Sequence, residues 1–150
     1  MRNSLLYLKF AIQYAVENKT FSHIKQFKRW HKDTQSKGNT LSLELPWITY
    51  DAIDFFKKII KNDMRLFEWG SGGSTLFFAR RCREVITIEH DSKWHGFLSE
   101  KLEELLIENV TLKEIKPEKI EASPEKSPLN PNDFLSSDKN FQDYSFESYV

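Results

Sequence analysis

Two glutamates at the ends of two apolar runs frame a glycine-rich turn in this chain. The stretch from Arg65 to Asp91 reads RLFEWGSGGSTLFFARRCREVITIEHD, with Glu68 just before the turn and Glu89 at the end of the second run. Glycine lets the backbone adopt positive φ and lets a ligand approach closely, and a following helix offers free N–H groups to a negative group. A strand, a glycine turn and a helix in this order are typical of a nucleotide-cofactor site.

The two acids narrow the choice of ligand. The pyrophosphate of a dinucleotide is doubly negative, so a carboxylate at Glu68 would repel it, whereas a ligand with a cationic amino-acid end would be attracted. S-adenosylmethionine has such an end, and a carboxylate at Glu89 can accept hydrogen bonds from both hydroxyls of its ribose. A nicotinamide-dependent enzyme is disfavoured further because Thr75 stands where the dinucleotide fingerprint prefers Gly or Ala.

The motif EWGSGGS at 68–74, followed by VITIEHD, resembles class I S-adenosylmethionine-dependent methyltransferases, whose glycine motif is acid-x-Gly-x-Gly-x-Gly. Ser74 stands where that family has its third glycine. The PW pair ahead of the preceding helix, and Trp94 soon after EHD, resemble a bacterial subgroup of the family. The resemblance covers residues 45–115 and implies a Rossmann-like fold.

By this resemblance, Gly70 and Gly72 admit the methionine end of the cofactor, Glu68 orients its amino group and Glu89 holds its ribose. The whole set implied for cofactor binding is Glu68, Gly70, Ser71, Gly72, Gly73, Ser74, Thr75, Glu89, His90 and Asp91. The resemblance assigns no catalytic residue, and the methyl acceptor is unknown.

Several of these residues also have a purely structural interpretation. Glu68 could pair with Arg65 or Arg80, Asp91 could cap the next helix, and Trp94 could be a packing residue rather than a cofactor lid. The four histidines show no metal-ligand spacing, and Cys82 is the only cysteine, so neither a metal site nor a disulfide framework is expected.

The elements that must position these residues alternate along the middle of the chain. Hydrophobic patterning predicts strands at 64–69, 84–90 and 109–115, with helices at 75–82 and 91–109; Leu98, Leu102, Leu105 and Leu106 lie along one side of the second helix. This β-α-β-α-β order implies a parallel sheet with right-handed crossovers. The predicted fold class is therefore α/β, a Rossmann-like partial parallel sheet with N-terminal helices and an irregular C-terminal tail.

Three segments are expected. Residues 1–38 form a basic helical arm in two pieces, broken near 18–21, and residues 39–116 form the cofactor-binding half-domain, with a helix around 52–60 ahead of the first strand. Residues 117–150 form an irregular tail that holds four of the five prolines, and its last aromatics look like the approach to a further element. No fourth strand is found beside the first, so the chain is expected to be truncated after the third strand.

The net charge of zero hides an asymmetry that suggests an alternative function. Up to Gly38 there are eight basic residues but only two acidic ones, with Phe21, Phe27 and Trp30 interleaved. Such an arm could make the chain a non-catalytic interaction module for nucleic acid or another anionic partner, or it could be a solvated basic helix face.

Two further expectations concern assembly and location. A missing fourth strand would leave the edge of the first strand exposed, which would allow a homodimer through that edge. No run of 18 apolar residues and no signal-peptide cleavage pattern is present, so a transmembrane segment is not expected and the cytoplasm is the expected location.

Overall fold

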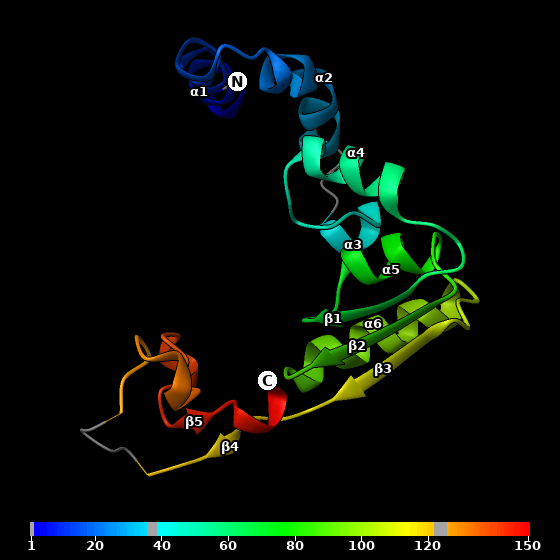
Figure 1. The fold of residues 1–150 in the computed structure, drawn as a ribbon, viewed down its shortest axis with the longest axis vertical. Helices are drawn as coiled ribbons and strands as arrows, with labels where there is room; N and C mark the ends of the chain where they lie inside the picture. The colour runs from blue at the N-terminus through cyan, green and yellow to red at the C-terminus, as the bar shows by residue number, and fades with distance from the viewer. Residues whose placement is uncertain (1, 36–38, 122–125) are drawn as a thin grey trace.

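The computed structural model describes residues 2–35, 39–121 and 126–150. The chain forms an elongated arc, with two N-terminal helices at one end, a small sheet in the middle and the C-terminal tail at the other end (Figure 1). Residues 36–38 of the predicted loop and residues 122–125 of the predicted tail lie outside the described residues.

The central sheet is parallel and has three strands. Strands β1 (Arg65–Trp69), β2 (Glu84–Glu89) and β3 (Val110–Glu114) lie in the order β1-β2-β3. The register places Glu68 opposite Thr87 and Glu89 opposite Glu114. The carboxyl ends of all three strands therefore meet at one edge of the sheet, and the predicted α/β class is confirmed.

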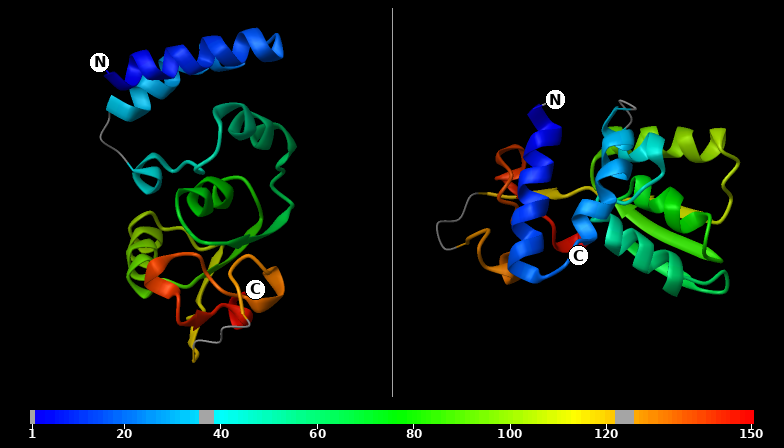
Figure 2. Two further views of the ribbon diagram at one scale, coloured as in Figure 1. Left: turned by 90° about the vertical axis from the view of Figure 1, so that its left-hand side faces the viewer. Right: turned by 90° about the horizontal axis from the view of Figure 1, so that it is seen from above.

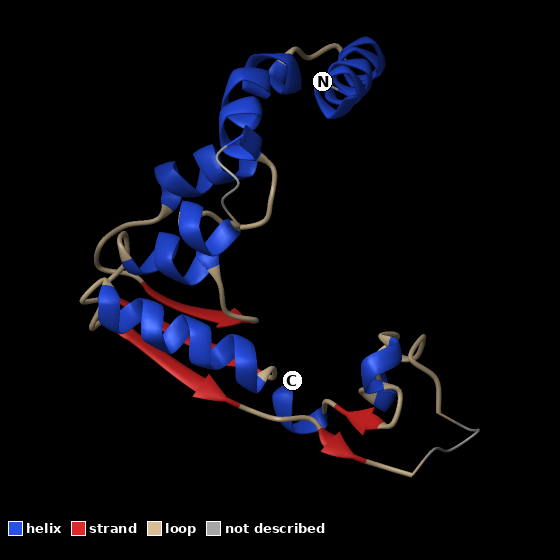
Figure 3. Ribbon diagram, turned by 180° about the vertical axis from the view of Figure 1, so that it is seen from behind, coloured by secondary structure: helices blue, strands red, loops and turns tan. Residues whose placement is uncertain are grey.

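Two helices follow the strands and supply the core. Helix α5 (Gly73–Ala79) packs against β2, and α6 (Ser92–Glu104) lies along β2 and β3 (Figure 3). Phe77 and Leu98 are fully buried, since both face the sheet layer. The prediction that Leu106 lies on the apolar side of this helix was wrong, because α6 ends at Glu104. Leu106 has φ of 52°, and this left-handed backbone turns its side chain away from the core, so that it is 84% exposed.

The N-terminal arm is helical as predicted. Helices α1 (Arg2–Asn18) and α2 (Ser22–Gln35) meet through Tyr7, whose ring lies 4.5 Å from that of Trp30 and 5.6 Å from that of Phe27. A short helix α3 (Thr40–Leu43), which the sequence did not indicate, follows, and Asn39 caps it by accepting a bond from the Ser42 N–H. Helix α4 (Tyr50–Ile59) then leads to β1.

The tail is mostly irregular, but it carries a small ladder that the sequence analysis did not anticipate. Strand β4 (Glu118–Lys119) pairs antiparallel with β5 (Tyr144–Ser145), and three single 3₁₀ turns lie at Pro131–Asp133, Lys139–Phe141 and Glu147–Tyr149. This pairing folds the tail back, so that the last turn lies near the carboxyl end of β2 (Figures 1 and 2). The end of the tail thus belongs to the neighbourhood of the candidate site.

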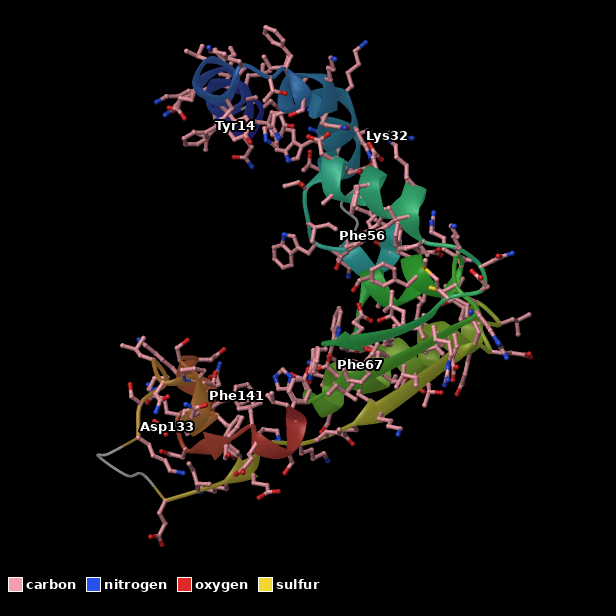
Figure 4. All side chains as sticks on the ribbon, viewed as in Figure 1. Tyr14, Lys32, Phe56, Phe67, Asp133 and Phe141 are labelled. Atoms are coloured by element: carbon pink, nitrogen blue, oxygen red, sulfur yellow. The ribbon has the colours of Figure 1, made fainter. Side chains whose placement is uncertain are left out.

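Strand β1 is the edge strand of the described sheet, because it pairs with β2 alone. Phe67 and Trp69 are about half exposed, at 48% and 58%, and their rings contact each other at 4.7 Å (Figure 4 labels Phe67). Within the described ranges, none of the helices has the length and apolar character needed to cross a membrane.

The backbone of α3 approaches α5 very closely at Gly73. A Cβ atom at Gly73 would lie 2.0 Å from the carbonyl oxygen of Thr40 and 2.5 Å from that of Leu45. Both obstacles are main-chain atoms, so no side-chain rotation would relieve the clash. Gly73 is therefore required for packing between α3 and the glycine turn.

We expect Gly73→Ala to lower the free energy of unfolding by about 3 kcal/mol, the upper end of the usual cost of overpacking. Gly96→Ala is the matched control, because a Cβ at Gly96 in α6 meets nothing within 4 Å. The control should be stabilising by about 1 kcal/mol, since alanine has the higher helix propensity. Urea unfolding followed by circular dichroism measures both, and equal stability of Gly73→Ala and the wild type would contradict the close contact.

Candidate functional site

The carboxylate of Glu89 ties the glycine turn to the end of β2. Its Oε2 atom accepts bonds from the Ser71 N–H and the Ser71 hydroxyl, both at 3.0 Å. Its Oε1 atom accepts from the backbone N–H groups of His90 and Asp91, at 2.8 and 3.0 Å. With about two acceptor sites on each oxygen, this buried carboxylate is fully used within the protein.

Glu68, at the end of β1, is held by the start of α5. The Thr75 hydroxyl donates to Glu68 Oε2 at 2.6 Å and accepts from the Gly72 N–H at 2.9 Å. Burial raises the pKa of the Glu68 carboxyl, while hydrogen bonds from Ser74, Thr75 and Thr87 oppose the rise and the charge of Glu89 adds to it. The two predicted acids therefore lie on adjacent strand ends and are close enough to interact.

The three glycines of the turn have different roles. Gly70 has φ of 76°, a conformation that other residues rarely adopt, and a Cβ there would meet only the Tyr149 hydroxyl, at 3.9 Å. Gly72 is extended, and a Cβ there would make ordinary contact with Trp94, also at 3.9 Å. Gly70 is thus the turn position whose positive φ favours glycine, whereas Gly73 serves packing.

Asp91 and Trp94 are both used structurally. Asp91 Oδ1 accepts bonds from the N–H groups of Lys93 and Trp94, so Asp91 caps α6. The Trp94 indole N–H donates to the Ser71 carbonyl at 2.7 Å, which holds the outer side of the glycine turn. Asp91 is an exposed residue.

The pairings considered for Glu68 are absent among the described residues. Arg65 pairs with Glu84 on the neighbouring strand, at 2.5 Å. Arg80 pairs with Glu44 instead, through two hydrogen bonds. Glu68 therefore has hydroxyl partners but no arginine, which leaves its carboxyl without a cationic neighbour in the part of the chain that the structure describes.

The tail contributes aromatic residues that the sequence analysis did not place in the site. The rings of Phe141, Phe146 and Tyr149 each lie within 5.5 Å of the His90 ring, all edge-on. The Tyr149 hydroxyl also lies 3.4 Å from the carbonyl oxygen of Ile88, next to Gly70. The aromatic density of 141–149 was the available signal, although the long irregular stretch before it concealed where these rings would return.

Of the three aromatic residues interleaved in the basic arm, Phe27 and Trp30 pack within the protein, whereas Phe21 is 65% exposed. Between α1 and α2, the Tyr7 ring stacks on that of Trp30 and is tilted against that of Phe27. The Arg29 guanidinium pairs with Asp54 and lies over the Tyr50 ring. Lys25, Lys28 and Lys32 stay exposed. A search of the described residues for three or more His, Cys, Asp or Glu side chains that could hold a metal ion finds no such group.

Comparisons with known proteins give one partial structural likeness. No family model matches the chain, and neither does any curated protein. A solved structure with local similarity is that of "a putative methyltransferase" from Streptococcus mutans in complex with SAH. The sequence identity is 24%, the TM-score is 0.40, and the match covers 43% of this chain and 38% of that one. The match thus spans less than two thirds of that protein's length.

The raised pKa of Glu68 predicts a pH-dependent stability. The folded state holds the proton of the Glu68 carboxyl more tightly than the unfolded state does, so protonated Glu68 contributes to the free energy of unfolding. This contribution is fully present below the ordinary pKa of glutamate. It is lost as the pH rises through the higher pKa that Glu68 has in the folded state. Glu68→Gln removes this contribution, while its side-chain carbonyl still accepts from Thr75. We therefore expect the stability of the wild type relative to the variant to fall with rising pH in chemical unfolding.

Glu100→Gln, which removes an exposed carboxylate from α6, is the charge-matched control. A stability difference between wild type and Glu68→Gln that does not vary with pH would show that the pKa of Glu68 is the same in the folded and unfolded states.

Proposed function

We propose that the glycine turn and the two strand-end acids bind S-adenosylmethionine, and that the chain is the cofactor-binding part of a methyltransferase. The observation that supports this most strongly is the placement of Glu68 and Glu89 on adjacent parallel strands, on either side of Gly70. Open α/β sheets bind ligands at the carboxyl ends of their strands, where both acids lie.

Glu68 suits the amino end of the ligand. It is partly buried, its pKa is raised, and it pairs with no arginine among the described residues. A bound ammonium group would favour the ionised form of Glu68 and offset the cost of its burial. A phosphate group would instead add a second negative charge beside Glu89, which argues against a dinucleotide.

Glu89 suits the ribose, although its oxygens are already engaged. Of its four donors, three are backbone N–H groups that belong to the turn and to the end of β2, and only the Ser71 hydroxyl is free to rotate away. A ribose hydroxyl would therefore replace the Ser71 hydroxyl at Oε2 while the backbone bonds remain. His90, Ser74 and Asp91 complete the proposed set around the turn.

The cofactor, when bound, would supply an activated methyl group, and the described residues bind and orient it. In such a site the protein contributes proximity and alignment rather than a covalent intermediate. No described residue is assigned as a general base. The acceptor stays unidentified within this proposal.

Calorimetric titration of S-adenosylhomocysteine separates the role of Glu89 from a general loss of structure. Glu89→Gln should weaken binding by about tenfold or more, because charge-assisted hydrogen bonds each contribute roughly 1.5–3 kcal/mol. Ser71→Ala, at the same carboxylate, should leave affinity within about threefold of the wild type or improve it, since the competing hydroxyl is removed.

Circular dichroism and urea unfolding of each variant establish that it is folded before titration. If Glu89→Gln and Ser71→Ala lowered the affinity for S-adenosylhomocysteine equally, the cause would be damage to the glycine turn rather than loss of a ribose contact. Failure of the folded wild type to bind S-adenosylhomocysteine, or stronger binding of NAD at the same site, would contradict the proposal.

A further inference from the structure

Helix α1 turns its large apolar side chains away from the protein. Its buried positions are the small residues Ala11 and Ala15, which share a side of the helix with Tyr7, whose ring packs on α2. Five of its large apolar side chains are instead between 50% and 76% exposed, namely Leu5, Leu6, Phe10, Ile12 and Val16. A surface helix ordinarily buries such side chains and exposes polar ones. Helix α1 therefore has an apolar surface that the described residues leave uncovered.

Three of these exposed side chains form a stripe along α1. Spacings of seven and four residues place Leu5, Ile12 and Val16 on one side of the helix, and we call these three residues the apolar stripe. Lys9 follows Leu5 by four residues, lies on the same side and is exposed. A lysine beside such a stripe can lay its methylene stem on apolar surface while its ammonium group stays in water. This side of α1 thus combines aliphatic surface with positive charge.

Helix α2 adds further positive charge next to α1. Lys25, Lys28 and Lys32 follow a helical spacing along α2 and are exposed. Within the described ranges, none of these three lysines forms an ion pair. Residues 1–38 hold eight basic residues against two acidic ones, and α1 and α2 lie at the end of the arc that is remote from the sheet (Figures 1 and 2). An apolar helix and a basic helix therefore lie side by side at this end of the molecule.

The chemistry of this surface favours a lipid partner over two alternatives. A second copy of the chain would bring two basic arms together, and like charges repel. Nucleic acid would match the charge, but it binds largely by stacking its bases on aromatic rings. The apolar stripe is aliphatic, and the rings of Phe27 and Trp30 in the arm are packed against Tyr7. An anionic membrane matches both features, since its phosphates attract lysines and its acyl chains accept aliphatic side chains.

We propose that the two N-terminal helices dock on the surface of an anionic membrane. The apolar stripe of α1 inserts among the lipid headgroups, and the exposed lysines of α1 and α2 contact the lipid phosphates. Helix α1 then lies in the plane of the interface, as amphipathic helices with basic and aliphatic residues do. The sheet and the glycine turn, which are remote from this end of the arc, stay outside the bilayer. This inference does not depend on the proposed function.

The test is cosedimentation of the full chain with vesicles of two compositions. Vesicles of phosphatidylcholine alone offer acyl chains without net charge, and equimolar phosphatidylcholine and phosphatidylglycerol add negative charge. We expect the chain to bind the anionic vesicles at least about tenfold more tightly, because each lysine near such a surface contributes roughly fivefold. Added salt should reduce this difference by screening the charges.

Two pairs of variants separate the apolar and the charged contributions. Leu5→Gln should weaken binding to the anionic vesicles by about fivefold or more, because a leucine no longer inserts. Its control is Leu129→Gln, at a leucine in the tail that is 91% exposed, which should leave binding unchanged. Lys9→Gln should weaken binding by roughly fivefold, whereas Lys61→Gln, at an exposed lysine between α4 and β1, should stay within about twofold of the wild type. Circular dichroism establishes that each variant is folded.

Equal binding to the two kinds of vesicle, no vesicle binding by the folded chain, or equal effects of Leu5→Gln and Leu129→Gln would each overturn the proposal. Self-association that Leu5→Gln abolishes, without vesicle binding, would assign the stripe to a second copy of the chain. Binding of single-stranded DNA that Lys9→Gln weakens and Leu5→Gln does not, again without vesicle binding, would assign the arm to nucleic acid. These measurements contain no S-adenosylhomocysteine, so their outcome and that of the cofactor experiment are independent.

Discussion

The hydrogen bonds of the Glu89 carboxylate are the constraint on which the candidate site depends. They join the glycine turn after β1 to the residues that end β2, together with the hydrogen bond from the Trp94 indole to the Ser71 carbonyl. A buried carboxylate must be satisfied in this way, because an unpaired one would cost far more than a typical hydrogen bond contributes. The same need makes Glu89 a structural residue, and in the proposed function it would contact a ligand through exchange of the one donor that can rotate, the Ser71 hydroxyl.

The N-terminal segment is coupled to this site through two close contacts. Gly73 admits the backbone of Thr40 and Leu45, and Trp94, which holds the turn, also lines a cavity together with residues of α2 and α4. Helices α1 and α2 lie away from the sheet (Figure 2), and α2 contacts α4 through the Arg29–Asp54 ion pair. The tail approaches from the opposite end of the arc, where Tyr149 reaches Gly70 and its neighbouring rings surround His90.

Local patterns in the sequence were sufficient for the sheet and for the grouping of the site. Four consecutive β-branched residues at 85–88, and an acid followed by glycines, specify a strand and a turn through short-range geometry alone. The structural roles of individual residues could not be predicted from these local patterns, because the roles depend on contacts between segments that are distant in the sequence. Gly73 looks like a ligand-facing glycine until α3 is in place, and Leu106 fits the helical row until its left-handed backbone is seen. Tyr149 could not be placed without the β4–β5 pairing, which joins segments separated by a long proline-rich stretch.

The most direct measurement is a crystal structure of the chain with S-adenosylhomocysteine bound. The account predicts that a ribose hydroxyl lies within hydrogen-bonding distance of Glu89 Oε2, that the Ser71 hydroxyl has rotated away, and that the backbone bonds of His90 and Asp91 to Oε1 are unchanged. A ligand amino group beside Glu68 would complete the agreement. A ligand found elsewhere, or one bound at the turn with the Ser71–Glu89 bond intact and no ribose contact, would contradict the central claim.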